Sequence, residues 1–355
     1  MMVQDMIKSP LLDIIVPVYN GASYIQAFFD MFKPQADAEV RFLFVDDGSK
    51  DNTLSLLKEQ EEEGILPMKV IHQENAGVAA ARNAGIDASD AAYIAIFDID
   101  DVCAPDYIPT LKENAENGDF DVLIFNRVTF YDDQHKFPEG YGRLAAEISN
   151  EEILRQVLFD ASRYGISVNI LLLSKDYILE RNLRFAEGYP YYEDGHFLYR
   201  ALAGSRRIRR LDRWLYGYVF VHDGSEMNKF SPERLRCLEL FKEVEEVLAV
   251  EAPGFASVFK KYGISRIYWS ILWQTAFVSP SRKDFVRFAT ATHAEKYMRM
   301  LKGFPEGKVR VLRVLYLISK NLYFYTVCIM GRRYTALNKT SSDILDEAIR
   351  ACPDL

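Results

Sequence analysis

The sequence predicts an α/β fold, with a doubly wound, mainly parallel sheet that carries helices on both faces and a C-terminal helical region. In residues 1–130, short apolar runs alternate with segments of helical periodicity, and parallel strands need such crossovers. The chain is 49% hydrophobic and 13% aromatic, which suits a packed core. After Pro232 the segments have helical periodicity throughout.

Five strands and four helices are expected in the first part of the chain. Strands are expected at 13–20, 40–47, 68–73, 92–100 and 121–128, which are short runs rich in β-branched and aromatic residues. Helices are expected between them at 21–33, 51–63, 77–89 and 106–117. Polar residues gather where the strands end, at Tyr19–Asn20, Asp46–Ser49, Asn75 and Asp98–Asp101. Carboxyl ends of parallel strands form the ligand crevice of such sheets, so one nucleotide-sized site is expected there.

From about residue 150 the alternation loosens. A helix is expected at 150–160, strands near 166–174 and 211–223, and an aromatic, acidic loop at 188–197. Helical segments follow Ser231 and Pro232. We therefore expect one α/β domain over residues 1–228 and a helical region over residues 229–355.

Three carboxylates lie at the end of the fourth expected strand, at Asp98, Asp100 and Asp101. They repel one another unless a cation lies between them. Mg²⁺ and Mn²⁺ take oxygen ligands and are often completed by phosphate oxygens, so the pattern favours a metal site that binds a diphosphate ester. The alternative is a helix start, where aspartate is also favoured.

Four motifs stand in a fixed order along the chain. They are IVPVYNG at 15–21, VDDGSKDNT at 45–53, ENAGVAAARNAG at 74–85 and FDIDD at 97–101. As a set, they resemble the amino-terminal signature of family 2 glycosyltransferases, which have the GT-A fold. The resemblance covers roughly residues 11–225, and it implies a nucleotide-sugar half at about 11–130 and an acceptor half at about 131–228.

The resemblance implies an inverting transferase that moves a hexosyl or N-acetylhexosaminyl group from a nucleotide-diphosphate sugar, with a UDP-sugar as the expected donor. The expected acceptor is a hydroxyl of a glycan or of a lipid-linked glycan. The family also implies a role in bacterial surface polysaccharide synthesis and a divalent metal, Mn²⁺ or Mg²⁺, as cofactor.

Several residues of these motifs have a physical interpretation as nucleotide contacts. Pro17 ends the first strand and presents Tyr19. Asp47, at the second strand end, could accept a hydrogen bond from the imino group of a uracil-like base. Gly77 lets the backbone approach a ligand closely.

Asn75 and Arg82 flank the start of the third helix, where an amide and a guanidinium could reach the base or the phosphates. A surface salt bridge is the alternative for Arg82. The resemblance implies that Asp47, Asn75 and Arg82 contact the nucleotide. It also implies that Asp98 lies by the ribose or the metal and that Asp100 is a metal ligand.

The second group of candidate residues is Glu193 and Asp194, within the aromatic loop. Inverting sugar transfer needs a base for the acceptor hydroxyl, and a carboxylate among tyrosines has a raised pKa that suits this task. The alternative is that both residues simply begin a helix. The resemblance assigns the base to Asp194 and leaves Glu193 to orient the acceptor or the loop.

His222 is a candidate third metal ligand, because neutral imidazole is a good donor to Mn²⁺. The segment 216–225 resembles the closing strand and loop of the family, which often carries an arginine where this chain has Val219–Val221. A hydrogen-bonded histidine without a metal is the alternative. The missing arginine implies that the metal, Lys229 or another cation neutralises the leaving diphosphate.

The C-terminal region has an unusual charge. Residues 256–340 hold 16 Lys and Arg against three acidic residues, a net charge of +13. Because the whole chain has a net charge of −8, the remaining residues carry −21. The apolar stretch 308–333 contains Arg310, Arg313 and Lys320 on one helical stripe. An amphipathic helix on an anionic membrane is expected here, with a buried helix as the alternative.

Other features predict a cytoplasmic protein, with the inner face of the cell membrane as the alternative location. The chain begins without a signal-peptide pattern, and its four cysteines lack metal or disulfide spacing. Three other classes are alternatives: a nucleotidyltransferase, a nucleic-acid-binding protein and a catalytically inactive GT-A-like protein that acts as a membrane-associated assembly partner. The loop after the first strand is not basic, and the acidic first domain disfavours nucleic acid.

Overall fold

The computed structural model describes residues 9–131, 135–138, 146–159, 167–220, 231–331 and 340–353. They divide into two compact units. The first holds the described residues within Met1–Ile153, Asp160–Gly188 and Phe197–Phe220, and the second those within Leu154–Phe159, Tyr189–His196 and Val221–Leu355. The expected boundary at residue 228 stays a prediction, because it falls in a stretch outside these ranges.

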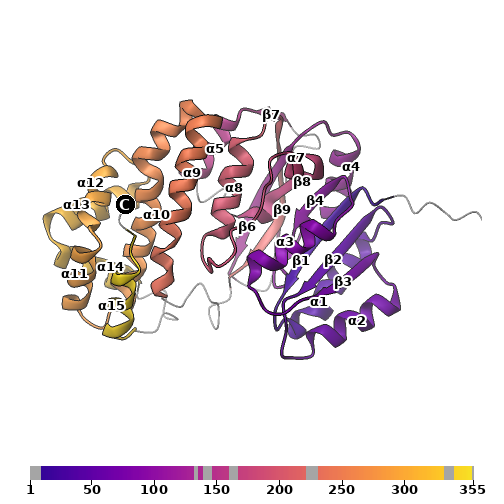
Figure 1. The fold of residues 1–355 in the computed structure, drawn as a ribbon, viewed down its shortest axis with the longest axis horizontal. Coiled ribbons are helices and arrows are strands. Elements are labelled where there is room, and N and C mark those ends of the chain that lie inside the picture. The colour runs from indigo at the N-terminus through magenta and orange to yellow at the C-terminus, as the bar shows by residue number, and fades with distance from the viewer. Residues whose placement is uncertain are drawn as a thin grey trace, which may run out of the picture. The chain divides into compact units, whose positions relative to one another are not determined.

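The first unit contains all the described strands and the helices that connect them (Figure 1). Its elements are β1 (Leu12–Val18), α1 (Ala22–Phe32), η1 (Lys33–Gln35), β2 (Val40–Asp46), α2 (Thr53–Glu63), β3 (Met68–His72), α3 (Val78–Ala88), β4 (Tyr93–Ile96), β5 (Val102–Cys103), α4 (Tyr107–Glu116), β6 (Val122–Phe130), β7 (Ala146–Ile148), η2 (Val168–Ile170), β8 (Leu171–Ser174), α7 (Lys175–Glu180) and β9 (Ile208–Val219). Helices α5 (Asn150–Phe159) and α8 (Glu193–Ala203) each have residues in both units.

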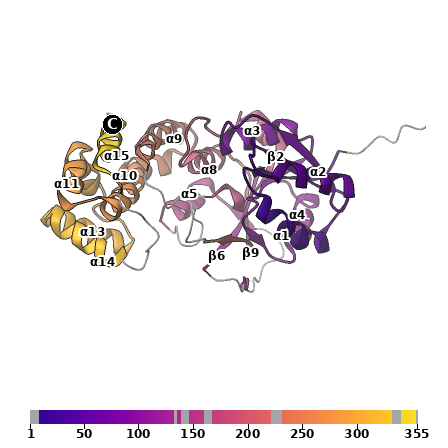
Figure 2. The same ribbon diagram turned by 90° about the horizontal axis from the view of Figure 1, so that it is seen from below.

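The sheet has the order β3-β2-β1-β4-β8-β6-β9-β5, and β7 also pairs with β9. Strands β3, β2, β1 and β4 are parallel, as the alternation of strands and helices predicts. Right-handed crossovers place α1 and α3 on opposite faces, because the chain reverses its direction across the sheet after β3 (Figure 2). β8 runs antiparallel between β4 and β6, so this part of the sheet is mixed.

Aromatic rings fill the face of the sheet that α1 covers. The ring centroid of Phe28 lies 5.2 Å from that of Phe44, and the ring of Phe32 lies 5.1 Å from that of Phe97. All four side chains are at most 1% exposed. Burial of such large side chains contributes about 1.5–3 kcal/mol each, which fixes the strand ends that follow.

The second unit is helical in its described residues. Its elements are η4 (Pro232–Leu235), α9 (Cys237–Glu251), α10 (Pro253–Val278), α11 (Arg282–Ala291), α12 (Ala294–Met300), α13 (Gly307–Ile318), α14 (Lys320–Gly331) and α15 (Ser342–Arg350). The stretch 308–333, expected as one helix, is broken at Ser319, whose extended backbone (φ −161°, ψ 123°) ends α13. Within the described ranges, no helix has the length and apolarity that a membrane span needs.

Candidate functional site

The parallel strands bring four of the sequence motifs to one edge of the sheet. Val18 at the end of β1 pairs with Asp46 at the end of β2, and Asp46 pairs with His72 at the end of β3. The residues just beyond these ends therefore lie at the same edge. This is where open α/β sheets bind ligands, and it is the location that the sequence predicts.

A small pocket of about 200 Å³ opens at this edge. Its lining residues are Pro17, Tyr19, Asn20, Gly21, Tyr24, Val78, Asp98, Ile99 and Asp100. Four expected site residues thus line one cavity, with Tyr19 about half exposed. Tyr24 and Val78 join them from the first turns of α1 and α3, positions that motif spacing alone does not single out.

Asp47 shapes the loop between β3 and α3. Its carboxylate is 3% exposed and accepts hydrogen bonds from Gln73 Nε2 (2.8 Å) and from the backbone N–H groups of Ala76 and Gly77 (both 2.9 Å). The Asn75 amide donates to the Asp47 carbonyl oxygen (2.9 Å). Gly77 has φ +92°, a conformation that glycine adopts without strain. These bonds join three of the expected nucleotide contacts into one structure.

Arg82 reaches the acidic motif from the first turns of α3. Its Nη2 donates to Asp98 Oδ1 (3.2 Å), and its guanidinium lies over the ring of Phe185 at 5.2 Å. The Arg82 side chain is only 6% exposed, whereas Asp98 remains 31% exposed. The ion pair is thus largely buried on the arginine side, and it leaves the Asp98 carboxylate accessible from the pocket.

Asp100 and Asp101 have opposite environments. Asp100 is exposed and lines the pocket. Asp101 is buried, and its carboxylate accepts hydrogen bonds from the Tyr216 hydroxyl and from the Val219 N–H (2.9 Å). Asp101 therefore ties the motif to β9 rather than to the pocket. The sequence does not reveal this partner, because Tyr216 lies far along the chain.

The acidic motif carries charge that a cation would relieve. Although part of the Asp100 side chain is at the surface, the protein atoms around it reduce the hydration of its carboxylate, and this loss together with the nearby Asp98 carboxylate raises the pKa of Asp100 to about 6. Burial, Asp98 and Asp100 raise the pKa of Asp101 well above its ordinary value. Two accessible carboxylates with a crowded negative charge fit a hard divalent cation that takes further oxygen ligands from a phosphate.

Asp98 and Asp100 are the two candidate metal ligands in the described part of the chain. No group of three or more His, Cys, Asp and Glu side chains suited to a metal ion occurs among those residues. His222, the expected third ligand, lies outside them. The assignments of Asp98, Asp100 and His222 to a metal stay predictions.

Glu193 and Asp194 belong to the second unit, and they open helix α8. Asp194 Oδ1 accepts a hydrogen bond from the Gly195 N–H (2.7 Å). Tyr192, just before them, has φ +65°, which is uncommon for a residue with a side chain. A turn in this conformation needs support from its surroundings.

That support comes from η4 and α9. Tyr189 donates a hydrogen bond to Glu239 Oε2 (3.1 Å), and the buried Arg234 lies over the ring of Tyr191 at 4.1 Å. His196 Nε2 lies 3.1 Å from Glu243 Oε2. The turn that carries Glu193 and Asp194 is therefore held by helices that follow it by about 40 to 50 residues, and no local pattern predicts these partners.

Comparison with known proteins points to one enzyme family. Residues 13–178 match the family model "Glycosyl transferase family 2". The uncharacterized glycosyltransferase EpsJ of Bacillus subtilis is 27% identical over 210 residues, which are 59% of this chain and 61% of EpsJ. The putative glycosyltransferase EpsH of the same organism is 28% identical over 225 residues, 63% and 64% of the two chains. The chain thus spans about three fifths of the length of these curated relatives.

One solved structure has a similar fold along most of the chain. S. aureus TarS 1–349, solved in complex with UDP-GlcNAc, aligns with a TM-score of 0.58 at 19% identity and covers 91% of each chain. This similarity concerns the fold alone. It confirms the expected GT-A-type α/β fold with a C-terminal helical region.

Proposed function

We propose that the chain is a member of glycosyl transferase family 2 and an inverting glycosyltransferase that uses a divalent metal and a nucleotide-diphosphate sugar. The observation that carries this proposal is the pocket at the strand ends, where two accessible carboxylates, Asp98 and Asp100, lie beside Tyr19. A ligand with an aromatic base and a metal-bound diphosphate has the chemistry to match them.

In this proposal, each residue of the first unit has a task in binding the donor. Asp98 and Asp100 hold the cation, and the Arg82 guanidinium fixes the Asp98 carboxylate. Asp47 holds the loop of Asn75 and Gly77 in position against the base or the phosphates. A bound Mn²⁺ or Mg²⁺ would stabilise the negative charge that develops on the leaving diphosphate.

In the same proposal, Asp194 is the general base and Glu193 orients the acceptor. The acceptor oxygen forms a bond to the anomeric carbon while the bond from that carbon to the diphosphate oxygen breaks. The acceptor proton passes to Asp194, and the nucleoside diphosphate leaves with the bonding electrons. One displacement inverts the anomeric carbon without a covalent enzyme intermediate.

The finer assignments rest on the relatives. TarS 1–349 was solved with UDP-GlcNAc and with UDP, which supports a UDP-sugar as donor. A glycan or lipid-linked acceptor in bacterial surface polysaccharide synthesis follows from the family. We place the catalytic domain in residues 1–228, and residues 229–355 contact the inner face of an anionic membrane, a role that the net charge of +13 over residues 256–340 supports.

Calorimetry against UDP, GDP, CDP and ADP, with and without Mn²⁺, tests the proposal. We expect one diphosphate, UDP, to bind only with the metal, and Asp100→Ala to abolish that binding. Asp30→Ala, which removes another exposed aspartate of the first unit, is the matched control and should bind normally. If the folded protein binds none of the nucleotides, it is an inactive relative that serves as an assembly partner.

A further inference from the structure

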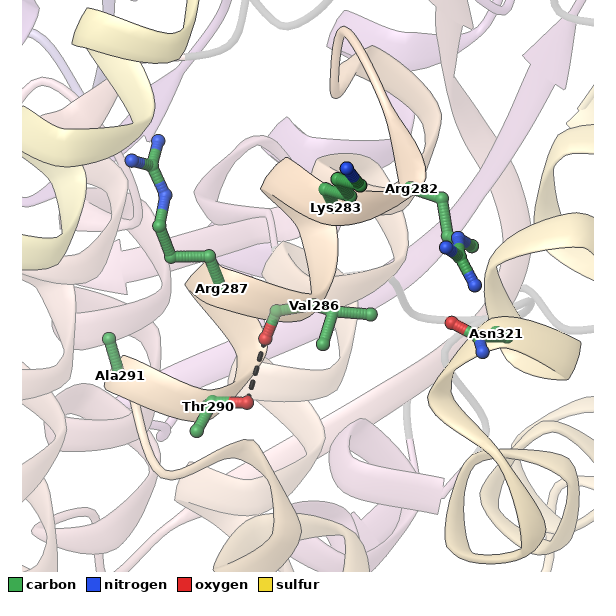
Figure 3. A pocket seen from close by; sticks show the side chains of 7 residues that line it. All are labelled: Arg282, Lys283, Val286, Arg287, Thr290, Ala291 and Asn321. Atoms are coloured by element: carbon green, nitrogen blue, oxygen red, sulfur yellow. Dashed lines mark hydrogen bonds between the residues drawn. The ribbon is translucent and has the colours of Figure 1, made fainter.

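A second pocket, of about 660 Å³, lies in the helical unit between α11 and α14 (Figure 3). Its lining residues are Arg282, Lys283, Val286, Arg287, Thr290, Ala291 and Asn321. The lining thus holds three cations, a hydroxyl and an amide beside the apolar side chains of Val286 and Ala291. Such a lining suits a compact anion attached to an apolar body.

The three cations of this pocket differ in availability. Arg287 pairs with Asp346 (3.0 Å) and Asp284 (3.5 Å), and Figure 3 shows it directed away from Asn321. Arg282 is directed toward Asn321. Within the described residues, neither Arg282 nor Lys283 forms an ion pair. Two positive charges without a protein counter-charge therefore remain for a ligand.

Apolar stripes lie next to this pocket along the chain. On α13, Val311, Val314 and Ile318 are 59%, 48% and 71% exposed, at spacings of three and four that keep them on one side of the helix. On α14, the exposed stripe is Leu322, Tyr325 and Ile329, at 42%, 55% and 64%. The two helices pack against each other, and the pocket residue Asn321 lies between the two stripes in the sequence.

We propose that the α11–α14 pocket and the two stripes together bind an anionic lipid bilayer. A lipid phosphate occupies the pocket, and the stripes lie in the membrane interface. Arg282, Lys283 and the Asn321 amide are the donors to the phosphate oxygens. The stripes favour a bilayer over a nucleic acid, because exposed aliphatic side chains gain free energy from acyl chains and none from phosphates. The inference rests on the membrane contact proposed above and assigns its residues.

Sedimentation with vesicles of known composition tests the pocket. The full chain should bind vesicles of phosphatidylglycerol and phosphatidylcholine at low ionic strength, and bind pure phosphatidylcholine much more weakly. Arg282→Glu with Lys283→Glu should lower the partition coefficient by about thirtyfold or more. The matched control is Lys260→Glu with Lys261→Glu, an adjacent exposed pair on α10 that changes the net charge equally. An equal loss of vesicle binding in both double variants would overturn the pocket as the binding site. Binding would then rest only on a diffuse electrostatic attraction.

A second pair of variants tests the stripes. Ile318→Asp should weaken vesicle binding severalfold, whereas Val250→Asp, at a 79% exposed valine of α9, should leave it nearly unchanged. Equal effects of the two substitutions would overturn the role of the stripes.

Two further outcomes separate this inference from its neighbours. If inorganic phosphate or a single-stranded RNA binds through Arg282 and Lys283 while vesicles do not, the bilayer is wrong. The assay contains no nucleotide sugar, so its result is independent of glycosyl transfer. Vesicle binding that survives every substitution would keep the membrane contact and reject the proposed site.

Discussion

At the scale of single residues, neighbouring aspartates of one motif have different tasks. Asp98 and Asp100 face the pocket, whereas Asp101 is fastened to Tyr216 and Val219 of β9. The sequence predicts the acidic cluster and its place at a strand end, because both depend on adjacent residues. It does not predict which carboxylate is buried away from the pocket, because that depends on Tyr216, which lies 115 residues further along the chain.

Asp47→Asn should destabilise the first unit by about 1–3 kcal/mol, because an amide replaces a carboxylate oxygen that accepts hydrogen bonds from backbone N–H groups. Equilibrium unfolding in urea measures the loss. Asp30→Asn, on the exposed face of α1, is the control and should change stability little. Unchanged stability in Asp47→Asn would mean that the loop holds its shape without these bonds.

At the scale of elements, the predictable part of the fold is the part made by local patterns. The alternation of strands and helices predicts β1 to β4 and their parallel order, which the structure confirms. The antiparallel insertion of β8 is not predictable from its four residues, because strand pairing is decided by distant partners. The contacts between α9 and the turn that carries Asp194 are not predictable from the sequence for the same reason.

Gly85 is the contact point between α3 and β1. A Cβ atom at this position would lie 2.4 Å from Cγ2 of Ile15, so Gly85→Ala should destabilise the protein by about 1–3 kcal/mol through overpacking. The same substitution should cost less in an Ile15→Ala background. Gly307→Ala is the control, since nothing lies within 4 Å of a Cβ there. Thermal unfolding of Gly85→Ala, Ile15→Ala, the double variant and Gly307→Ala measures these losses of stability. If the losses of the two single variants simply add in the double variant, the two residues are not in direct contact.

Glu243 is a positioning residue for the turn that carries Asp194. Glu243→Ala should lower kcat of the proposed glycosyl transfer, measured as UDP formed, by about tenfold to a hundredfold with little change in the donor KM. The reason is that the turn loses its contact at His196. Glu243→Gln, which keeps the shape of the side chain, should recover most of the rate.

The control for this prediction is Glu246→Ala, at an exposed glutamate on the same helix. A rise in the donor KM at constant kcat would show that Glu243 acts on donor binding, contrary to the positioning role.

At the scale of the whole molecule, the residues divide between two compact units, each with its own buried side chains. The sequence predicts an α/β part and a helical part from the change in periodicity. It does not predict that Tyr189–His196 groups with the helical part, because the segment lies between strands in the chain. Membership of a unit is decided by contacts that sequence order does not reveal.

Two compact units predict two calorimetric transitions. UDP with Mn²⁺, at a hundredfold excess over Kd, should stabilise the first unit by about 2.7 kcal/mol and so raise its transition temperature. The transition temperature of the second unit should change little. Asp100→Ala should remove the shift. A single transition that moves as a whole upon binding would show that the two units unfold as one.

Helix α8 is shared between the units: Glu193–His196 belong to the helical unit and Phe197–Ala203 to the sheet unit. Substitutions in η4 or α9 therefore affect the turn of Tyr192 directly, and none of the residues that line the pocket at the strand ends belongs to these two helices. Natural selection thus has two separate sets of positions to act on. Descendants of this chain can change the turn that carries Asp194 while they inherit the pocket at the strand ends unchanged.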